Sequence, residues 1–276
     1  MSDYSLRFGG IARLYGQQAV NILQNAHFCV IGIGGVGSWV AEALARNGIG
    51  NITLIDLDDI CITNINRQIH ALSETIGESK VDVMATRIKQ INPDCQVNII
   101  EDFVTVENLT DLLKKNYDYV IDAIDSVDIK TRLIAYCKRN KLPIITIGGA
   151  GGQIDPSKIA ITDLSKTYQD PLLAKVKNQL RREFSFPRSD LAKASKRKFS
   201  IDAVFSTEQL RYPSSDPKNS GEVCLAKPAV TDGEHSAMKL DCSGGFGAAT
   251  HVTATFAFFA VGRAIDKLLK KQETKS

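Results

Sequence analysis

Glycines and an acidic residue occur in this chain at spacings that bind nucleotides. Four closely spaced glycines follow an early apolar run and open a helical pattern: Gly32, Gly34, Gly35 and Gly37. Such a turn lets the backbone approach a phosphate and directs helix N–H groups at the anion. Asp56 lies 19 residues beyond Gly37, at the end of the next apolar run, where it is placed to accept hydrogen bonds from ribose hydroxyls. The pattern predicts a nucleotide site without identifying the nucleotide.

Further polar residues follow the same apolar runs and extend the predicted chemistry. They are Asp58, Asn64, Arg67, Gln68, Lys80 and Asp125. A dehydrogenase needs only the glycines and Asp56, whereas an adenylating enzyme must also neutralise a triphosphate, hold Mg²⁺ and stabilise charge at the α-phosphate. Arg67 and Lys80 suit the phosphates, and Asp125 suits the metal. Each residue taken alone is also explained as a surface or capping residue, but the set favours adenylation.

These residues need a scaffold that brings strand ends together. The apolar runs predict strands at 27–33, 52–56, 96–101, 118–122 and 143–147, and the amphipathic stretches predict helices at 35–48, 79–91, 106–115 and 128–140. Strands that alternate with helices in this way indicate a doubly wound, Rossmann-like α/β fold with a mostly parallel sheet. Ligands of such sheets bind at the carboxyl ends of the strands. We further expect a strand at 153–163 and a C-terminal helix at about 248–270.

The segment 165–218 has a different character. It carries 12 Lys or Arg against 6 Asp or Glu, although the whole chain has a net charge of only +3. One interpretation is a solvated, mobile insertion; the other is a phosphate-binding surface for nucleic acid. The candidate contacts are Arg181, Arg182, Lys193, Lys196, Arg197 and Lys198.

Composition narrows the class of protein. The six cysteines are scattered without a C-x-x-C pair, which indicates reduced thiols in a cytoplasmic protein and no zinc site. No secretory signal is visible at the N-terminus. The 19 residues from Gly244 to Gly262 carry no formal charge, close to the length of a membrane span. We expect a helix packed on the sheet there; membrane association through 244–262 is the alternative.

The ordered set of motifs resembles the ubiquitin-activating-enzyme superfamily, which includes the bacterial adenylyltransferases of thiamine and molybdopterin sulfur transfer. The similarity rests on Gly32-Ile33-Gly34-Gly35-Val36-Gly37, Asp56-x-Asp58, Asn64-x-x-Arg67-Gln68, Lys80 and Asp122-x-x-Asp125, and covers about residues 6–165. It implies that Asp56 holds the ribose of ATP, Arg67 and Lys80 its phosphates and Asp125 its Mg²⁺, with Asn64 and Gln68 completing the polar wall.

One departure from that superfamily lies near the N-terminus. The sulfur-carrier adenylyltransferases begin with an R-[YF]-x-R-Q pattern whose second arginine reaches into the partner subunit's site, but here glycine stands at that position, in Arg7-Phe8-Gly9-Gly10. Arg13 is the first candidate to take over the role, and Arg7 is the other.

Over nearly its whole length the chain is similar to one branch, the tRNA threonylcarbamoyladenosine dehydratases. The similarity is carried by Ala12-Arg13-Leu14-Tyr15-Gly16, Thr63 to Ala71, Gly148 to Pro156, Val204 to Glu208 and Gly245 to Thr250. It implies a single adenylating domain over 1–276 that uses ATP to close the threonylcarbamoyl side chain into a ring. It also implies tRNA, not DNA, as the nucleic-acid partner, a homodimer, and a cysteine desulfurase with its sulfur acceptor protein as further partners.

Three other functions stay open at this point. The chain could activate the C-terminus of a sulfur-carrier or ubiquitin-like protein, where Cys224 or Cys242 would be candidates for a thioester; ring closure needs none. It could be a nicotinamide-dependent dehydrogenase on the glycine pattern alone, or a tRNA-binding protein without catalysis. His70, His235 and His251 have no partner at metal or triad spacing and are interpreted as structural.

Overall fold

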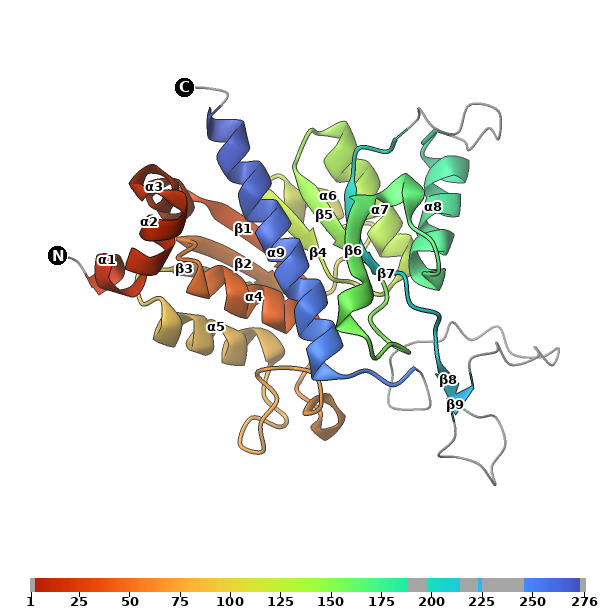
Figure 1. Cartoon of the computed structure of the whole chain (residues 1–276), viewed down its shortest axis with the longest axis horizontal. Helices are drawn as coiled ribbons and strands as arrows, with labels where there is room; N and C mark the ends of the chain where they lie inside the picture. Colours follow the sequence, from red (N-terminus) through yellow and green to blue (C-terminus); the bar gives the residue numbers. More distant parts are fainter. Residues whose placement is uncertain (1–2, 188–197, 214–222, 225–245, 274–276) are drawn as a thin grey trace.

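The chain folds around one large sheet that is covered by helices on both faces (Figure 1). The structure is a computed structural model that describes residues 3–187, 198–213, 223–224 and 246–273. Within them the sheet has seven strands: β1 His27–Ile31, β2 Asn51–Ile55, β3 Gln96–Ile100, β4 Tyr119–Asp122, β5 Ile144–Ile147, β6 Ile159–Asp163 and β7 Asp202–Ser206.

The strand order places a ligand crevice beside β1. The order is β3-β2-β1-β4-β5-β7-β6, and every pair is parallel except β6 with β7. The chain runs outward from β1 through β2 to β3 and then crosses to β4 on the other side of β1, so the topological switch point lies between β1 and β4. This arrangement confirms the predicted doubly wound, Rossmann-like α/β fold. A separate antiparallel pair joins β8 Tyr212–Pro213 to β9 Val223–Cys224.

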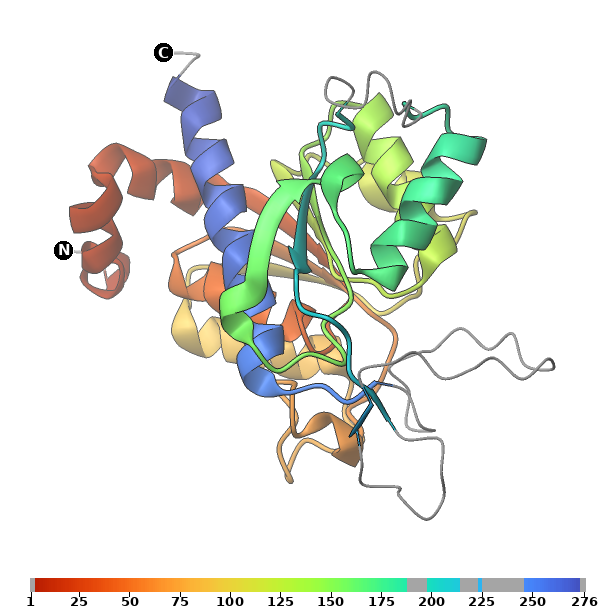
Figure 2. The same cartoon turned by 45° about the vertical axis from the view of Figure 1, so that its right-hand side comes forward.

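Helices cover the two faces through separate apolar cores. The described helices are α1 Asp3–Arg7, α2 Gly9–Tyr15, α3 Gln17–Asn25, α4 Gly37–Arg46, α5 Lys80–Ile91, α6 Leu109–Leu113, α7 Val127–Arg139, α8 Pro171–Glu183 and α9 Thr250–Glu273. Helices α4, α5 and α9 bury side chains against one face, and α6, α7 and α8 against the other (Figure 2). Along β1, Phe28 and Val30 point to the first core and Cys29 and Ile31 to the second, as the two-residue period of a strand requires.

Most helices and strands begin and end within a few residues of their predicted bounds, but one predicted strand needs a larger correction. The predicted strand 153–163 is a strand only over Ile159–Asp163. The Asp155 side chain accepts a hydrogen bond from the Ser157 amide at 3.0 Å, and Pro156 starts the short 3-10 helix η2 Pro156–Lys158. Proline has no N–H to donate to a strand, so the chain turns here before β6 begins.

The basic segment 165–218 contributes regular structure that the sequence pattern did not indicate. It contains α8 and β7, and β7 lies between β5 and β6 with all five residues buried. The strand was hidden because Asp202 and Ser206 flank a short apolar run; Asp202 is paired with Arg263 at 2.8 Å and Lys267 at 2.7 Å. Helix α9 occupies the place expected for a C-terminal helix. Within the described ranges, no helix is both long and apolar enough to cross a bilayer.

Candidate active site at the carboxyl edge of the sheet

The glycine turn after β1 is closed by contacts that leave no room for side chains at Gly32 and Gly37. Gly32 has φ +87°, and its amide donates to the Ile55 carbonyl at 2.9 Å. A Cβ on Gly32 would lie 3.0 Å from the Ala123 carbonyl oxygen, and one on Gly37 would overlap the Gly32 carbonyl. The turn therefore lies tightly against the ends of β2 and β4, and α4 begins directly from it.

Asp56 supports this turn from the end of β2. Its Oδ2 accepts the Ile33 amide at 2.5 Å, and its Oδ1 accepts the Asp58 amide at 2.9 Å. Burial raises the pKa of the Asp56 carboxyl above its usual range, while Lys80 and the two amides oppose that shift. Each carboxylate oxygen has two lone pairs, so bonds to the turn leave capacity for a ribose hydroxyl.

Lys80 and Asp58 form an ion pair beside Asp56. The Lys80 Nζ lies 2.7 Å from Asp58 Oδ2, with the lysine side chain 7% exposed and the aspartate 55% exposed. Lys80 begins α5, and its amide donates to the Asp58 carbonyl at 3.1 Å. The ammonium is thus held in place by a carboxylate that faces solvent, and a phosphate group would compete with Asp58 for it.

Arg67 lies against the glycine turn. Its Cγ and Cδ would each be 3.3 Å from a Cβ on Gly35, so a side chain at position 35 would require the arginine stem to shift by a few tenths of an ångström. Its Nη1 donates to the Thr63 carbonyl at 2.7 Å and to Asn66 Oδ1 at 3.0 Å. The loop that carries Arg67 is itself ordered by Asn64, whose buried Oδ1 accepts the Cys61 amide at 3.1 Å.

Gln68 lies next to Arg67 and is buried beside the turn. Its Nε2 would be 4.0 Å from a Cβ on Gly34, and its Oε1 has no hydrogen-bond partner among the described residues. A buried amide oxygen without a partner is unfavourable. This atom is therefore an acceptor available to a donor that enters the site.

The end of β4 presents one aspartate to solvent and buries another. Asp122 Oδ1 lies 2.8 Å from Lys130 Nζ, both side chains are 0% exposed, and Thr146 Oγ1 donates to Asp122 Oδ2 at 2.7 Å. Asp125, three residues on, is exposed and forms no hydrogen bond or ion pair with a described residue. The buried pair fixes the strand end and leaves the Asp125 carboxylate available for a cation.

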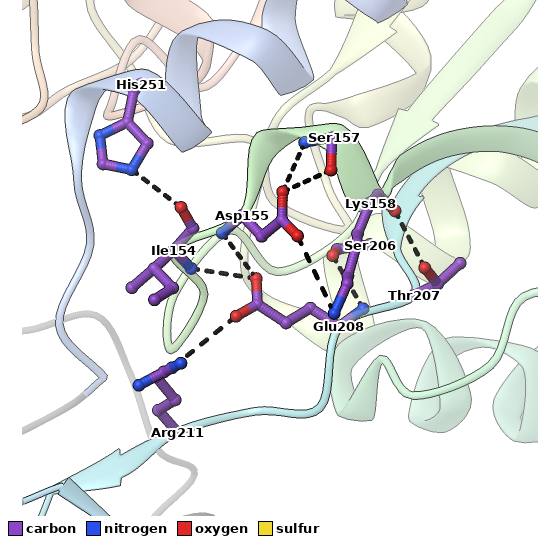
Figure 3. Close-up of polar contacts among 9 residues, drawn as sticks. All are labelled: Ile154, Asp155, Ser157, Lys158, Ser206, Thr207, Glu208, Arg211 and His251. Carbon is purple, nitrogen blue, oxygen red and sulfur yellow. Dashed lines mark hydrogen bonds and ion pairs between the residues drawn. The ribbon is translucent and has the colours of Figure 1, made fainter.

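Two buried carboxylates hold the loop 148–155 that follows β5. Asp170 Oδ2 accepts the Gly149 amide at 3.0 Å, and Glu208 Oε2 accepts the amides of Ile154 and Asp155 at 3.0 and 2.9 Å. Figure 3 shows Glu208 reaching this loop, with Arg211 at 3.7 Å from its other oxygen. The loop borders the edge that carries Asp125, because β4 and β5 are neighbours.

The structure thus brings one part of the predicted site together. The four glycines, Asp56, Asp58, Asn64, Arg67, Gln68, Lys80 and Asp125 follow β1, β2 and β4 at the same edge. Arg13 is elsewhere, on α2. The preceding helix α1 lies at the opposite edge of the sheet: the Tyr4 hydroxyl donates to the carbonyl of Gly48, just before β2, and Arg7 donates to the carbonyl of Ile91, the last residue of α5. Arg13 therefore does not join the site of its own chain.

The described members of the predicted nucleic-acid set, Arg181, Arg182 and Lys198, also lie away from this edge. Phe199, next to Lys198, donates its amide to Asp163, which pairs with the first residue of β7 at the amino edge of the sheet. The Arg181 guanidinium lies 5.3 Å from the centre of the Phe199 ring and donates to the Pro187 carbonyl. Arg182 pairs with Glu183. Lys193, Lys196 and Arg197 lie outside the described residues.

Other predicted candidates gain no catalytic contact here. Cys242 and His235 fall outside the described residues, as does the side chain of Cys224. Cys29, Cys95 and Cys137 are buried thiols. His70, interpreted as structural, is 1% exposed with neither ring nitrogen hydrogen-bonded to a described residue.

Sequence reasoning missed the buried residues that support the site: Lys130, Asp170 and Glu208. A lysine within the apolar face of α7 was the available signal for Lys130. Asp170 is followed by Pro171, as at a helix N-terminus, and caps α8 by accepting the Leu173 amide at 2.9 Å. No local sequence pattern identifies Glu208 as a supporting residue, because the residues that it bonds lie 53 and 54 positions away in the sequence.

A doubly wound sheet with this glycine turn, and with Arg67 and Lys80 at the same edge, is the arrangement expected of an adenylating class of protein. Consistent with that, residues 9–276 match the model of the ThiF family, and the chain belongs to that family.

Two curated relatives extend over almost the whole chain. The tRNA threonylcarbamoyladenosine dehydratase of Haemophilus influenzae is 58% identical over 99% of this chain and 97% of its own length. The Escherichia coli protein of the same name is 57% identical over 96% of this chain and 94% of its own length. The predicted resemblance to this branch is confirmed.

A solved structure gives the same result in three dimensions. The crystal structure of the E. coli dehydratase in complex with ATP superposes with a TM-score of 0.85 at 51% identity, covering 100% of this chain and 99% of that one. The same enzyme in complex with AMP gives 0.84 at 52% identity, covering 99% and 98%. The ThiS adenylyltransferase of E. coli is more distant, 35% identical over 51% of this chain and 55% of its own length.

Proposed function

We propose that this chain dehydrates threonylcarbamoyladenosine in tRNA to its cyclic form, using ATP through an acyl adenylate. The observation that carries the proposal is similarity over almost the full length to two enzymes named for that dehydration. The site agrees with it, because Arg67 and Lys80 offer cations beside a phosphate-binding glycine turn. These side chains would have no purpose in a protein that only moves a hydride.

The proposed reaction has two steps. The threonyl carboxylate attacks the α-phosphate of ATP, forming an O–P bond as the bond to pyrophosphate breaks. The neighbouring carbamoyl group then attacks the activated carbonyl, AMP leaves and one proton is released. Arg67 and Lys80 stabilise charge on the phosphates in the first step. The second is intramolecular, so holding the side chain in position supplies much of its acceleration.

Asp125 is the proposed ligand for Mg²⁺. The described residues contain no group of three or more His, Cys, Asp or Glu placed to hold a metal. The exposed, unpaired Asp125 carboxylate nevertheless fits a hard cation, which Mg²⁺ sites commonly bind with one or two carboxylates and substrate phosphates. When bound, the metal would neutralise charge on the triphosphate.

The proposal includes tRNA contact through the basic residues Arg181, Arg182, Lys193, Lys196, Arg197 and Lys198. The described ones lie at the amino edge of the sheet, so they would hold a part of the tRNA remote from the modified base. Replacing Lys196, Arg197 and Lys198 by neutral residues should weaken tRNA binding and flatten its salt dependence, as measured by filter binding at several salt concentrations. Equal loss of tRNA affinity in an Asp125→Ala variant would contradict this division of roles.

Assembly and location complete the proposal. We propose a homodimer in which Arg13 of one chain completes the site of the other, because Arg13 is remote from its own site. The dehydration of the tRNA would take place in the cytoplasm, where tRNA is modified. A cysteine desulfurase and its sulfur acceptor protein are included on the family resemblance alone.

The direct test is product analysis. Purified protein with ATP, Mg²⁺ and tRNA bearing the threonylcarbamoyl nucleoside should release AMP and pyrophosphate, and nucleoside mass spectrometry should show loss of one water. Arg67→Ala and Asp125→Ala should abolish ring closure while tRNA binding persists. No AMP formation by the wild-type protein with modified tRNA would refute the proposal.

The second candidate is adenylation of a sulfur-carrier protein, favoured by the similarity to the ThiS adenylyltransferase over half of the chain. The same assay separates the two. AMP release that needs a small protein with a free C-terminal glycine, and not tRNA, would select this alternative.

A further inference from the structure

The start of α9 contacts the loop that carries Arg67. Asn66 Nδ2 donates to the Ala248 carbonyl at 2.7 Å, and Thr250 Oγ1 donates to the Asn66 carbonyl at 2.5 Å. The Arg67 carbonyl accepts Trp39 Nε1 at 3.1 Å and Thr253 Oγ1 at 3.4 Å. In both views the start of α9 lies next to the loop between β2 and α5 (Figures 1 and 2). Residues 246–253, named the junction below, thus bond two consecutive residues of the loop.

Asn66 links this junction directly to the Arg67 guanidinium. Its Nδ2 donates to Ala248, and its Oδ1 accepts Arg67 Nη1 at 3.0 Å. One amide therefore satisfies a junction carbonyl and orients the arginine. If the loop shifted relative to α9, the acceptor for Arg67 would move with it.

The same junction also bonds the loop 148–155. The Gly247 carbonyl accepts the Gly152 amide at 2.7 Å, and His251 Nε2 lies 3.0 Å from the Ile154 carbonyl. Figure 3 shows this histidine above Ile154, whose amide is held by Glu208. A Cβ on Gly152 would come within 2.8 Å of the Phe246 ring, so this approach requires glycine.

We infer that Asn66 and Thr250 are positioning residues that hold Arg67 in register with the loop 148–155. The junction bonds the Arg67 loop on one side and the loop 148–155 on the other. The inference rests on the proposed function, in which Arg67 acts on the phosphates of ATP, and on the position of the loop 148–155 at the edge that carries Asp125. Neither residue needs to touch either ligand.

The physical reason is the sensitivity of the reaction to geometry. The carboxylate and the α-phosphate must meet within about 3–3.5 Å, and a displacement of about 1 Å costs on the order of a hundredfold in rate. Asn66, Thr250 and His251 are exposed, so each bond adds little to overall stability because water competes for it. Their removal should therefore affect the rate more than the fold.

The experiment compares variants that remove these hydrogen bonds with one that keeps the hydroxyl. Asn66→Ala and Thr250→Val remove the bonds, whereas Thr250→Ser keeps the hydroxyl. For tRNA-dependent AMP release at saturating tRNA, we expect kcat to fall about tenfold or more in the first two, with the KM for ATP changed much less. Thr250→Ser should retain wild-type kcat, and the thermal midpoint should stay within a few degrees in all three.

Thr255→Val is the matched control. Its hydroxyl donates to the His251 carbonyl at 2.7 Å within the same helix and contacts neither loop. Wild-type kcat in Asn66→Ala and Thr250→Val, or an equal loss in Thr255→Val, would overturn the inference. Full activity of Arg67→Ala would instead show that the proposed role of Arg67 is wrong, so the two failures are distinguishable.

Discussion

At the scale of single residues, buried charge under the site is the feature with the largest energetic consequence. Asp122 and Lys130 have no exposed side-chain surface, and the Thr146 hydroxyl and the Ile124 amide also donate hydrogen bonds to the carboxylate. A buried pair of this kind adds little relative to an apolar pair, but removing one partner leaves an uncompensated charge. The pair therefore orders the strand end that leads to Asp125.

Lys130→Met should destabilise the protein by about 3–5 kcal/mol, because Asp122 would be left buried without a cation. Urea unfolding at pH 7 measures the effect. Lys114→Met is the control, since Lys114 and Asp111 form an exposed pair, and its midpoint should hardly change. Equal midpoints for the two variants would mean that the buried pair does not support the fold.

His70 should make stability depend on pH. Burial, together with the charges of Lys80 and Arg87, lowers the pKa of His70 from the usual 6.5 to about 4, while the Ile33 backbone opposes the shift. The unfolded chain therefore takes up a proton between about pH 6.5 and 4 that the folded chain does not. This contribution to stability is complete above pH 6.5 and is lost as the pH falls toward 4.

Urea unfolding at pH 7 and pH 5 tests this contribution. His70→Gln should lose less stability between the two pH values than the wild-type protein does. Asp56, whose pKa is raised, acts in the opposite direction and is present in every variant. An unchanged pH dependence in His70→Gln would contradict a buried neutral imidazole.

At the scale of elements, the glycine turn and the first turn of α4 form one unit. Gly32 approaches the end of β4 and Gly37 approaches Gly32, so the turn has a single compact form. Glycine at these points allows the backbone to come close enough for a phosphate to reach the helix N–H groups. The adjacent Gly35 then provides the space that Arg67 occupies.

Gly37→Ala should abolish ATP binding, because its Cβ would overlap the Gly32 carbonyl and open the turn. The measurement is the shift of the thermal midpoint on adding ATP, which should vanish. Gly262→Ala, on the exposed side of α9 with no atom near its Cβ position, should keep the ATP shift and gain up to about 1 kcal/mol from helix propensity. An ATP shift in Gly37→Ala as large as the wild-type shift would contradict the turn's role.

At the scale of the whole molecule, functional groups lie at two edges of the sheet. The residues proposed for adenylation are at the carboxyl edge, whereas Arg181, Arg182 and Lys198 are toward the amino edge and Arg13 is on the N-terminal helices. Helix α8 runs from one edge to the other. Its N-cap Asp170 bonds Gly149 near the carboxyl edge, and Arg181 in its last turn lies over the Phe199 ring near the amino edge. A tRNA that contacted both edges would extend along the face of the sheet that α8 covers.

Mixing two inactive variants tests whether Arg13 acts across a dimer. Arg13→Ala and Asp125→Ala should each be inactive, but re-associated mixtures should recover about a quarter of the wild-type rate, because half the dimers then contain one intact site. AMP release after refolding the mixture measures this. No recovery, with mixed dimers demonstrated by differential tagging, would place Arg13 in its own site or outside the mechanism.

The sequence alone determined the glycine turn, the succession of strands and helices in the first half, and the polar residues at the ends of β1, β2 and β4. These follow from local patterns, because apolar periodicity and strand-end positions are properties of neighbouring residues. The tertiary structure decided what depends on distant segments. It placed β7 within the sheet, paired Asp58 with Lys80, and joined Asn66 to Ala248 across 182 residues. It also placed Arg181 and Lys198 away from the site, because the direction of α8 and the antiparallel β6–β7 pair is set by packing and not by any local pattern.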